Sequence, residues 1–596
     1  MGSLTVSGRN ATDRLRVCQA HFTGLGTDAQ KGDDVTDALS LESLYVGAHP
    51  VIQPFLERLR VRTFLEEAFG KPDPRTKLPL VDGAMLLLRN FTISRHPMYG
   101  VPDWTRQFDP KQLALQAGQV RLINDDRLGR VLDRLFVSDR RSMMTRLVIH
   151  MVNEFKIDLE RLHNDSSTLT FSGEYRGRPP RADGRERLRI VHGYNKDHRP
   201  DLKQLIWSLT VTADGAVPIH YNVYDGNVGD DKTHAGIWES LRKIVGSPEF
   251  IYVADSKLCT RSNMAHICEP GGHFITVLPR SRKEDGRFKE WISHNEAGWQ
   301  SIWDRPSSRR KTDPPEHFEA VEDPSPSSEG YRIIWYRSSE KWKRDEGVRD
   351  RAIEKALKDF QRLGERVGKR QLKTRKQVQA AADKIINETG TRQWVRVKIS
   401  THRSETLRQV SSGRPGKETR YSRRVTYVYK PVATVDADAV RTSASADGIY
   451  PLITDIPADQ MSSLDILSIY KYQPFVEKRH EQLKTAAEVV PVNFKTPERI
   501  EAYLFLYFIA VTVHALIERQ MRDAMKNQGI KSIPLYPEER ACRTPTADKI
   551  LGLFGSLRQH RLFENGCLIK TFWDELSDVQ FEVLRLLEIP ASAYGQ

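Results

Sequence analysis

The chain has 596 residues, too many for a single hydrophobic core, and about three or four domains are expected. It carries 92 Lys and Arg against 78 Asp and Glu, a net charge of +14. Its five cysteines are scattered without a CxxC pair, which argues against a disulfide framework. The longest apolar run, residues 502–517, contains His514 and is shorter than the roughly 18 residues that span a bilayer. We therefore expect a cytoplasmic protein that contacts no membrane, with this run as a buried helix.

The first 155 residues are predicted to be helical, because apolar residues recur every three or four positions. The pattern then changes to strands at 162–175, 202–212 and 217–226, the last two joined by a turn at Asp214-Gly215. A helix with Ile237, Leu241 and Ile244 on its apolar face follows. The buried strand EFIYVAD, a short helix near 261–268 and the strand HFITVLP complete the order βββαβαβ.

Residues 304–330 are polar and rich in proline, which predicts a loop or linker outside the sheet. Beyond them we expect a strand at RIIWY, one or two long basic helices at 346–388, and strands at WVRVKIS and RRVTYVYKPVATV. Residues 456–488 and most of the chain after them are predicted to be helical.

Positive charge is concentrated in residues 331–430, which hold 28 Lys and Arg against 11 Asp and Glu. A block this one-sided favours contact with nucleic acid, although solvated helices can also be charged. A second candidate for ligand binding is the group Cys259, His266, Cys268 and His273. Its spacing matches no standard zinc site, so helix packing is the favoured explanation.

Two aspartates mark a candidate site in the predicted sheet. Asp255 ends the strand FIYVAD, and Asp165 interrupts the first β segment, although either could be a turn or cap residue. If their strands are neighbours, two close carboxylates need a compensating cation. Oxygen ligands alone favour Mg²⁺ or Mn²⁺, and two such ions can cleave a phosphodiester bond. Three rival acids, which look like a turn and a helix start, rank lower: Asp225, Asp230 and Asp231.

The stretch SIYKYQPFVEKRHEQLK, residues 468–484, aligns four polar side chains near one stripe of a helix: Tyr470, Gln473, Glu477 and Lys484. Taken alone, this stripe is also what the solvent face of an amphipathic helix looks like. Pro474 lacks an N–H and disfavours helical geometry at the preceding residue, so the helix is expected to kink or restart there.

Together, LHNDSST, YVADSK and YKYQPFVEKRHEQLK resemble the three acidic motifs of bacterial insertion-sequence DDE transposases, over most of residues 40–520. The third resembles the Y-x2-R-x3-E-x6-K signature of the insertion-sequence-4-type superfamily, with Gln473 in place of the arginine. The resemblance implies an α/β protein with an RNase H-like core. It also implies a triad of Asp165, Asp255 and Glu477 that holds two Mg²⁺ or Mn²⁺ ions. DNA contacts are implied for Tyr470, Gln473 and Lys484, with Lys471 as a possible substitute for the missing arginine.

The resemblance also implies a division of the chain: a helical DNA-binding region at 1–155, a core at 156–295 and 456–490, a basic insertion at 296–455, and a helical region at 491–596. The expected activity is that of a transposase, which acts as a homodimer on double-stranded DNA and is nucleoid-associated when DNA-bound. It binds terminal inverted repeats, cleaves phosphodiester bonds and transfers the strands to target DNA. Three tryptophans are candidates for stacking a flipped base, against core packing: Trp335, Trp342 and Trp394. The alternatives are a non-catalytic domesticated DNA-binding protein and a nuclease without strand transfer.

Overall fold

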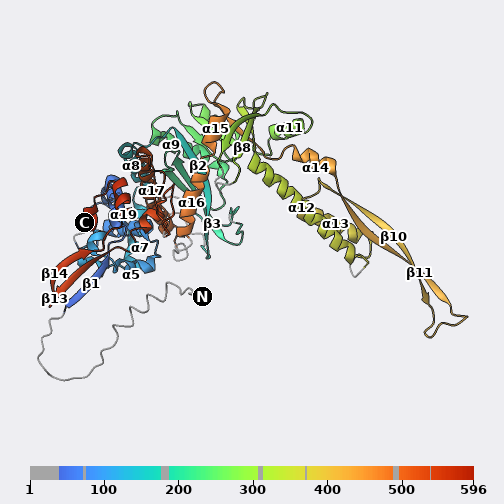
Figure 1. Cartoon of the computed structure of the whole chain (residues 1–596), viewed down its shortest axis with the longest axis horizontal. Coiled ribbons are helices and arrows are strands. Elements are labelled where there is room, and N and C mark those ends of the chain that lie inside the picture. The colour runs from blue at the N-terminus through green and yellow to red at the C-terminus, as the bar shows by residue number, and fades with distance from the viewer. Residues whose placement is uncertain are drawn as a thin grey trace, which may run out of the picture.

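The computed structural model describes residues 39–71, 75–175, 187–196, 198–306, 313–368, 372–487, 496–536 and 538–596, without the side chains of 483–487. At its centre lies a mixed sheet of nine strands in the order β4-β3-β2-β5-β6-β12-β9-β8-β7 (Figure 1). The strands are β2 (Arg161–Phe171), β3 (Lys203–Thr212), β4 (Pro218–Asp225), β5 (Ile251–Val253), β6 (His273–Val277), β7 (Gln300–Arg305), β8 (Glu316–Glu322), β9 (Arg332–Ser338) and β12 (Ile449–Thr454).

The first half of the sheet follows the predicted pattern. Strands β2, β3 and β4 form an antiparallel meander, and Gly215 supplies the positive φ of +80° that its second turn requires. Helices α9 (His234–Val245) and α10 (Arg261–Cys268) then connect to β5 and β6, which join β2 in parallel. The apolar stripe of α9 is buried as expected. The predicted order βββαβαβ is therefore confirmed for residues 161–277.

The second half of the sheet differs from the prediction for residues 304–330. Instead of a loop, this segment holds β8 and the end of β7, and both strands extend the sheet in antiparallel pairing. Phe318 and Ala320 alternate with less buried residues, as in a strand with one covered face, and they pack in a core beneath α15 (Ser463–Tyr470). Strand β12, which pairs with both β6 and β9, was also not predicted.

The helices of the first 155 residues form one hydrophobic core with the C-terminal helix α17 (Pro497–Asn527), which packs on α2, α4 and α7. By length and composition, α17 is the one helix among the described residues that could cross a membrane, yet 94% of its apolar window is buried inside the protein. These early helices are α2 (His49–Arg58), α3 (Val61–Phe69), α4 (Leu80–Ile93), α5 (Val101–Thr105), α6 (Ala117–Val120), α7 (Asp125–Val137) and α8 (Arg140–Phe155).

A second, three-stranded sheet joins both ends of the described chain. Strand β1 (Leu39–Tyr45) pairs with β13 (Arg558–Glu564), which forms a hairpin with β14 (Cys567–Trp573). The expectation of purely helical structure at the start and of mostly helical structure after 491 is wrong at these strands. The turn Asn565-Gly566, with φ of 49° and 78°, has the two left-handed residues that favour a tight hairpin. Helices α18 (Ala547–Gly552) and α19 (Asp578–Leu586) flank the hairpin in sequence.

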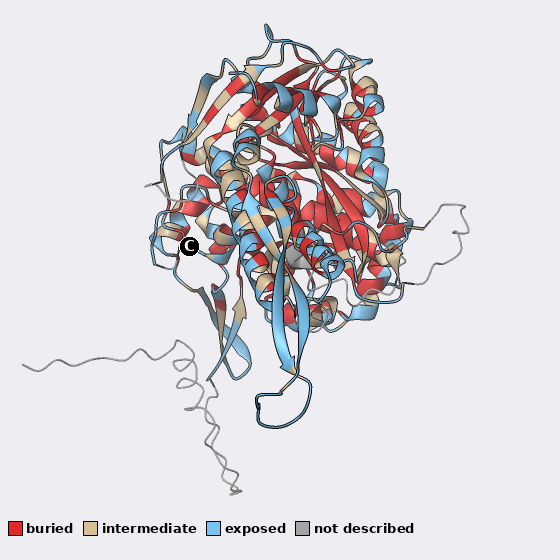
Figure 2. Ribbon diagram, turned by 90° about the vertical axis from the view of Figure 1, so that its right-hand side faces the viewer, coloured by how far each residue is buried: buried red, intermediate tan, exposed pale blue. Residues whose placement is uncertain are grey.

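An arm extends from the end of the central sheet where β8 and β9 lie (Figure 1). It contains α12 (Ser339–Arg366), α13 (Arg375–Thr389), a long antiparallel ribbon of β10 (Val395–Gln409) and β11 (Tyr421–Val435), and α14 (Ala437–Ala444). The predicted basic helices and both predicted strands are thus present. In Figure 2 the ribbon is mostly exposed, whereas the central sheet is mostly buried. Arg349 donates to both carboxylate oxygens of Asp447 in a buried pair that fixes α12 to the segment before β12.

Helix α16 (Pro474–Ala487) starts at the proline where a restart was predicted, since α15 ends at Tyr470. It packs against β2 and β3 and against α17. Its anchor is a buried ion pair, with Arg479 and Glu518 side chains only 4% and 5% exposed and 2.9 Å between Nη2 and Oε2. Arg479 Nε also donates to the Ala216 carbonyl at 3.0 Å.

Glu518→Gln is expected to lower the free energy of unfolding by about 3 kcal/mol, because it leaves the Arg479 guanidinium buried without its counter-charge. Urea denaturation of the full chain measures this effect. Asp523→Asn is the matched control on the same helix: its carboxylate pairs with Arg519 at 3.9 Å and is 53% exposed, so a loss below about 0.5 kcal/mol is expected. Equal decreases in the free energy of unfolding of the two variants would show that the buried Arg479–Glu518 pair contributes no more to stability than an exposed pair.

Candidate active site

Asp165 lies on β2, and Asp255 lies just beyond the end of β5, which pairs with β2 in parallel. Strand β2 pairs with β5 in the register Arg161↔Ile251 to His163↔Val253, an offset of 90 residues that also relates the two aspartates. Asp165 lies in the middle of β2, and Asp255 follows β5 by two residues, where the strand has ended. The parallel pairing therefore brings together the two carboxylates that the sequence had suggested as neighbours.

Glu477 is brought to the same strand by α16. Gln473, Glu477 and His480 share one helical stripe, and the two outer residues both bond to β2. Gln473 Nε2 donates to the Asn164 carbonyl at 2.7 Å, and His480 Nε2 donates to the Asp165 carbonyl at 3.2 Å. Glu477 lies between these anchors, and its side chain is exposed to solvent beside β2.

The electrostatics of Asp165 show that the three acids act on one another. Burial raises the pKa of Asp165 to about 7, and the charges of Asp255 and Glu477 add to this rise, whereas the Lys196 ammonium opposes it. The side chain keeps 22% of its surface exposed. The charged form of Asp165 is thus disfavoured by burial and by two neighbouring acids, and it is favoured by the Lys196 ammonium.

Tyr470 belongs to the same group. Its half-buried phenol has a raised pKa, first through burial and then through the charges of Asp255, Glu477 and Asp165. The hydroxyl is protonated at neutral pH, as in any tyrosine, and the shift extends this to higher pH, so it can donate a hydrogen bond beside the acids.

Gln473 and Lys471, also predicted to bind DNA, contact groups other than the acids. The Gln473 side chain is buried and holds β2, with Oε1 at 3.2 Å from His163 Nδ1, so its polar atoms face the protein and not solvent. Lys471 lies with Nζ 4.6 Å from the ring centroid of Phe318 on β8. Burial lowers its pKa, and a DNA contact in place of the missing arginine stays a prediction. Lys484 is part of α16, but its side chain lies outside the described residues.

Three polar residues near the acids were missed or ranked low by the sequence analysis. Lys196 pairs with Asp230 at 3.1 Å, and the charges of Asp255, Asp230 and Lys196 all act on the buried His234. Burial is the main reason that the pKa of His234 is lowered. Asp230 had been interpreted as a helix start, and it does lie just before α9. No signal in the sequence linked Lys196 to the site.

The carboxylates fit a divalent cation by their chemistry, without forming a finished cage. Within the described ranges, no three Asp, Glu, His or Cys side chains lie close enough to hold one metal ion as they stand. Oxygen donors and the shortage of positive charge at Asp165 suit a hard cation bound between pairs of carboxylates. The Cys and His group weighed for zinc is used otherwise, since His266 contacts Glu239 and His273 contacts Asp455.

The three tryptophans have different surroundings. Trp335 is fully buried, stacks on Phe288 with ring centroids 3.9 Å apart and donates to Asp323, so it is a core residue and cannot receive a flipped base. Trp394 is partly buried at the base of the ribbon. Trp342 on α12 is 42% exposed and remains available for stacking.

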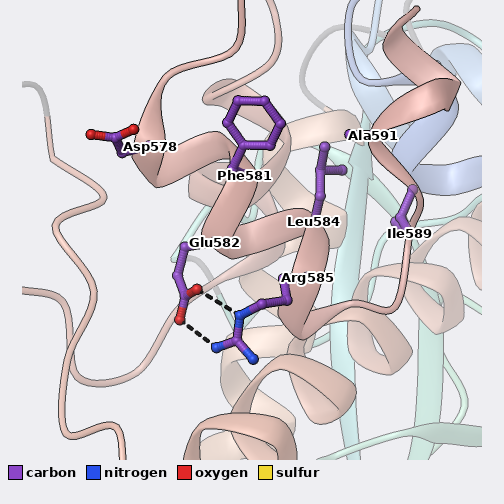
Figure 3. A pocket seen from close by; sticks show the side chains of 7 residues that line it. All are labelled: Asp578, Phe581, Glu582, Leu584, Arg585, Ile589 and Ala591. Atoms are coloured by element: carbon purple, nitrogen blue, oxygen red, sulfur yellow. Dashed lines mark hydrogen bonds and ion pairs between the residues drawn. The ribbon is translucent and has the colours of Figure 1, made fainter. Parts of the chain in front are cut away.

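A surface depression of about 550 Å³ lies elsewhere, on α19 and the turn after it (Figure 3). Its walls are mostly apolar. Of its three charged residues, Glu582 and Arg585 bond to each other, and Asp578 is the third. It contains none of the acids of the candidate active site and offers no reactive group.

In metal-free protein at pH 8, Asp165→Asn is expected to raise the free energy of unfolding by on the order of 1 kcal/mol. A carboxyl with a raised pKa binds more protons folded than unfolded, so its ionisation costs stability as pH rises from 3.8 toward 7. The gain should shrink at pH 5. Denaturation with EDTA at both pH values measures it, and the exposed Asp459→Asn is the control. A gain equal at both pH values would contradict the strained ionisation of Asp165.

Comparison with known proteins gives little beyond this geometry. No family model matches the chain, and no curated protein matches it. Among solved structures it is similar to the piggyBac transposase in a synaptic complex with hairpin DNA, with 12% identity and a TM-score of 0.27. The alignment covers 48% of this chain and 60% of that chain. A likeness this low does not define the fold, so any assignment of function depends on the site itself.

Proposed function

We propose that this chain is a DDE transposase that binds DNA ends, hydrolyses phosphodiester bonds there and joins the freed 3′ ends to target DNA. The observation that carries the proposal is the β2–β5 register, which places Asp165 near Asp255 beside the helix that bears Glu477. The charges of both other acids reach Asp165, as expected for one shared site. The strand order β4-β3-β2-β5-β6, with three antiparallel and two parallel strands, supports an RNase H-like core.

In this proposal each residue has a defined part. Asp165, Asp255 and Glu477 bind two Mg²⁺ or Mn²⁺ ions, which supply activation of the attacking hydroxyl and stabilisation of the leaving oxygen. Tyr470, whose phenol is protonated at neutral pH, donates to a backbone phosphate. Gln473 positions α16 through its bond to Asn164 and makes no DNA contact. This places an uncharged residue where an arginine stands in the signature that the motif resembles.

The β10–β11 ribbon supplies a surface for a polyanion. In its register, Arg396, Lys398, Arg408, Arg424 and Lys430 share one face, and in the part of the chain that the structure describes only Arg396 has an acidic partner. A two-stranded ribbon fits the major groove of B-DNA, and phosphate contacts by Lys and Arg provide most non-specific affinity. The ribbon therefore supports DNA as the substrate of the acidic site.

Asp165→Asn, Asp255→Asn and Glu477→Gln are each expected to reduce DNA cleavage by at least about 100-fold, since loss of even an outer partner of a metal site costs about 10- to 100-fold. Affinity for DNA should change little. The assay uses Mg²⁺ and duplex DNA carrying the sequences that flank this gene, and follows nicked and joined products on gels. Asp225→Asn is the control, because Asp225 ends β4 and pairs with Arg189.

The products separate the proposal from its alternatives. Joined products that depend on all three acids support a transposase, and nicked products alone indicate a nuclease without strand transfer. DNA binding without any cleavage would indicate a non-catalytic DNA-binding protein. Cleavage by any one of the three variants at the wild-type rate would remove that residue from the site.

Replacing both Arg408 and Arg424 by Gln is expected to weaken binding to non-specific duplex DNA. The slope of log K against log salt should fall in magnitude by about 1.8, or about 0.9 for each lost phosphate contact. Fluorescence anisotropy across a salt series measures this slope. The double variant Lys243→Gln, Arg585→Gln removes equal charge from exposed positions off the arm. The same slope change in this control would show a general effect of net charge.

A further inference from the structure

The segment between β2 and β3 delivers Lys196 to the acidic site. Its backbone is fixed by pairing of Val191 with Gln204 and by a bond from Gly226 N to the Arg189 carbonyl. Two glycines permit this close approach. A Cβ on Gly193 would clash with the Gly226 carbonyl, and one on Gly226 would clash with the carbonyls of Gln204 and Val191. The backbone contacts of residues 189–193 therefore fix the position of the segment that carries Lys196.

The Lys196 ammonium has three donors, and all three have acceptors. Nζ lies 2.6 Å from the Ser166 carbonyl, 2.7 Å from Ser166 Oγ and 3.1 Å from Asp230 Oδ2. The backbone N of Lys196 also donates to Thr168 Oγ1 at 3.2 Å. The side chain is 31% exposed and that of Asp230 is 13% exposed, so the pair is partly shielded from water. A positive charge is thus held beside the residue that follows Asp165.

This charge has a direct effect on the carboxylates. The Lys196 ammonium is the charge that most lowers the pKa of Asp165, whereas Asp255 and Glu477 raise it. His234 lies within reach of the same ammonium and of Asp255, Asp230 and Asp231. A divalent cation placed between the carboxylates would be repelled by Lys196 while drawn to the same negative charge.

We propose that Lys196 is a positioning residue that acts as an internal counter-cation, holding the metal-free carboxylates together and competing with divalent ions for them. This inference rests on the proposed function, because it takes Asp165, Asp255 and Glu477 to be metal ligands. It makes Lys196 a determinant of the metal concentration at which the site fills. Without the Lys196 ammonium, the metal-free site is less stable, and the binding of a divalent ion is more favourable.

The test is thermal unfolding of the full chain, free of DNA, across a titration with Mn²⁺. Lys196→Met is expected to lower the melting temperature in EDTA and to shift the midpoint of Mn²⁺ stabilisation to a concentration on the order of 10-fold lower. Lys196→Arg keeps the charge and should keep the wild-type midpoint. Lys243→Met, at an exposed position on α9, is the control and should change neither quantity. Should Lys196→Met not fold, Lys196→Gln retains a donor for Ser166 and should show the same shift.

The outcomes separate the proposed role of Lys196 from the proposed transposase function on which it rests. A lower melting temperature with an unchanged Mn²⁺ midpoint would make Lys196 a structural anchor only, and would leave the transposase proposal standing. Absence of Mn²⁺ stabilisation in every variant would overturn both, since no metal site would exist. A midpoint that shifts equally in Lys196→Arg would also overturn the inference, because the charge would then not be the cause.

Discussion

The burial of one carboxylate, Asp165, beside two other acids is the constraint on which the rest of this structure depends. Parallel pairing of β2 with β5 fixes Asp165 and Asp255 side by side, and α16 adds Glu477. Burial raises the pKa of Asp165 to about 7, and the charges of Asp255 and Glu477 add to the cost of ionising it. Ionisable groups with strongly shifted pKa values are typical of functional sites. Because such an arrangement is unfavourable, the surrounding fold must hold it in place.

The elements around the acids are accordingly fastened by buried polar contacts. Gln473 holds the start of α16 to β2, and the buried pair of Arg479 and Glu518 holds its middle to α17. Since breaking a buried ion pair costs far more than breaking an exposed one, these contacts favour a single position of the helix. Gln473 is better suited to this task than an arginine, because a neutral amide can be buried without desolvating a charge.

Local patterns in the sequence predicted the core sheet because each of its strands is a short buried run bounded by turns. The restart of α16 was predictable from Pro474 alone, since its effect is local. Strands β7 and β8 were missed because polar, proline-rich flanks outweighed a short alternation. Strand β12 was missed because its partners β6 and β9 lie far away in the chain. The Asn565-Gly566 hairpin signal was present in the sequence but had been overlooked within a region taken as helical.

In the candidate site, too, local patterns predicted some residues, whereas contacts between distant parts of the chain determine the others. Asp165 and Asp255 were identified by their positions in predicted strands, and Glu477 was identified by its resemblance to a motif. Their proximity depends on the β2–β5 register, which no local pattern contains. Lys196 was missed because it lies in a polar connection, and only the folded chain brings it to Asp230. The placement of Lys471 over Phe318 likewise depends on β8, a strand that was not expected.

The packing of α17 against α4 and α7 has a consequence for the order in which this protein folds. The early helices leave the ribosome long before their apolar partner has been made, so they must wait with exposed hydrophobic surface. Strand β1 waits longer still, because Leu39 pairs with Glu564. The helix that carries Glu477 is locked only when Glu518 of α17 is present. A ribosome-bound fragment that ends before α17 therefore lacks a fixed set of acids, and the site is completed only late in synthesis.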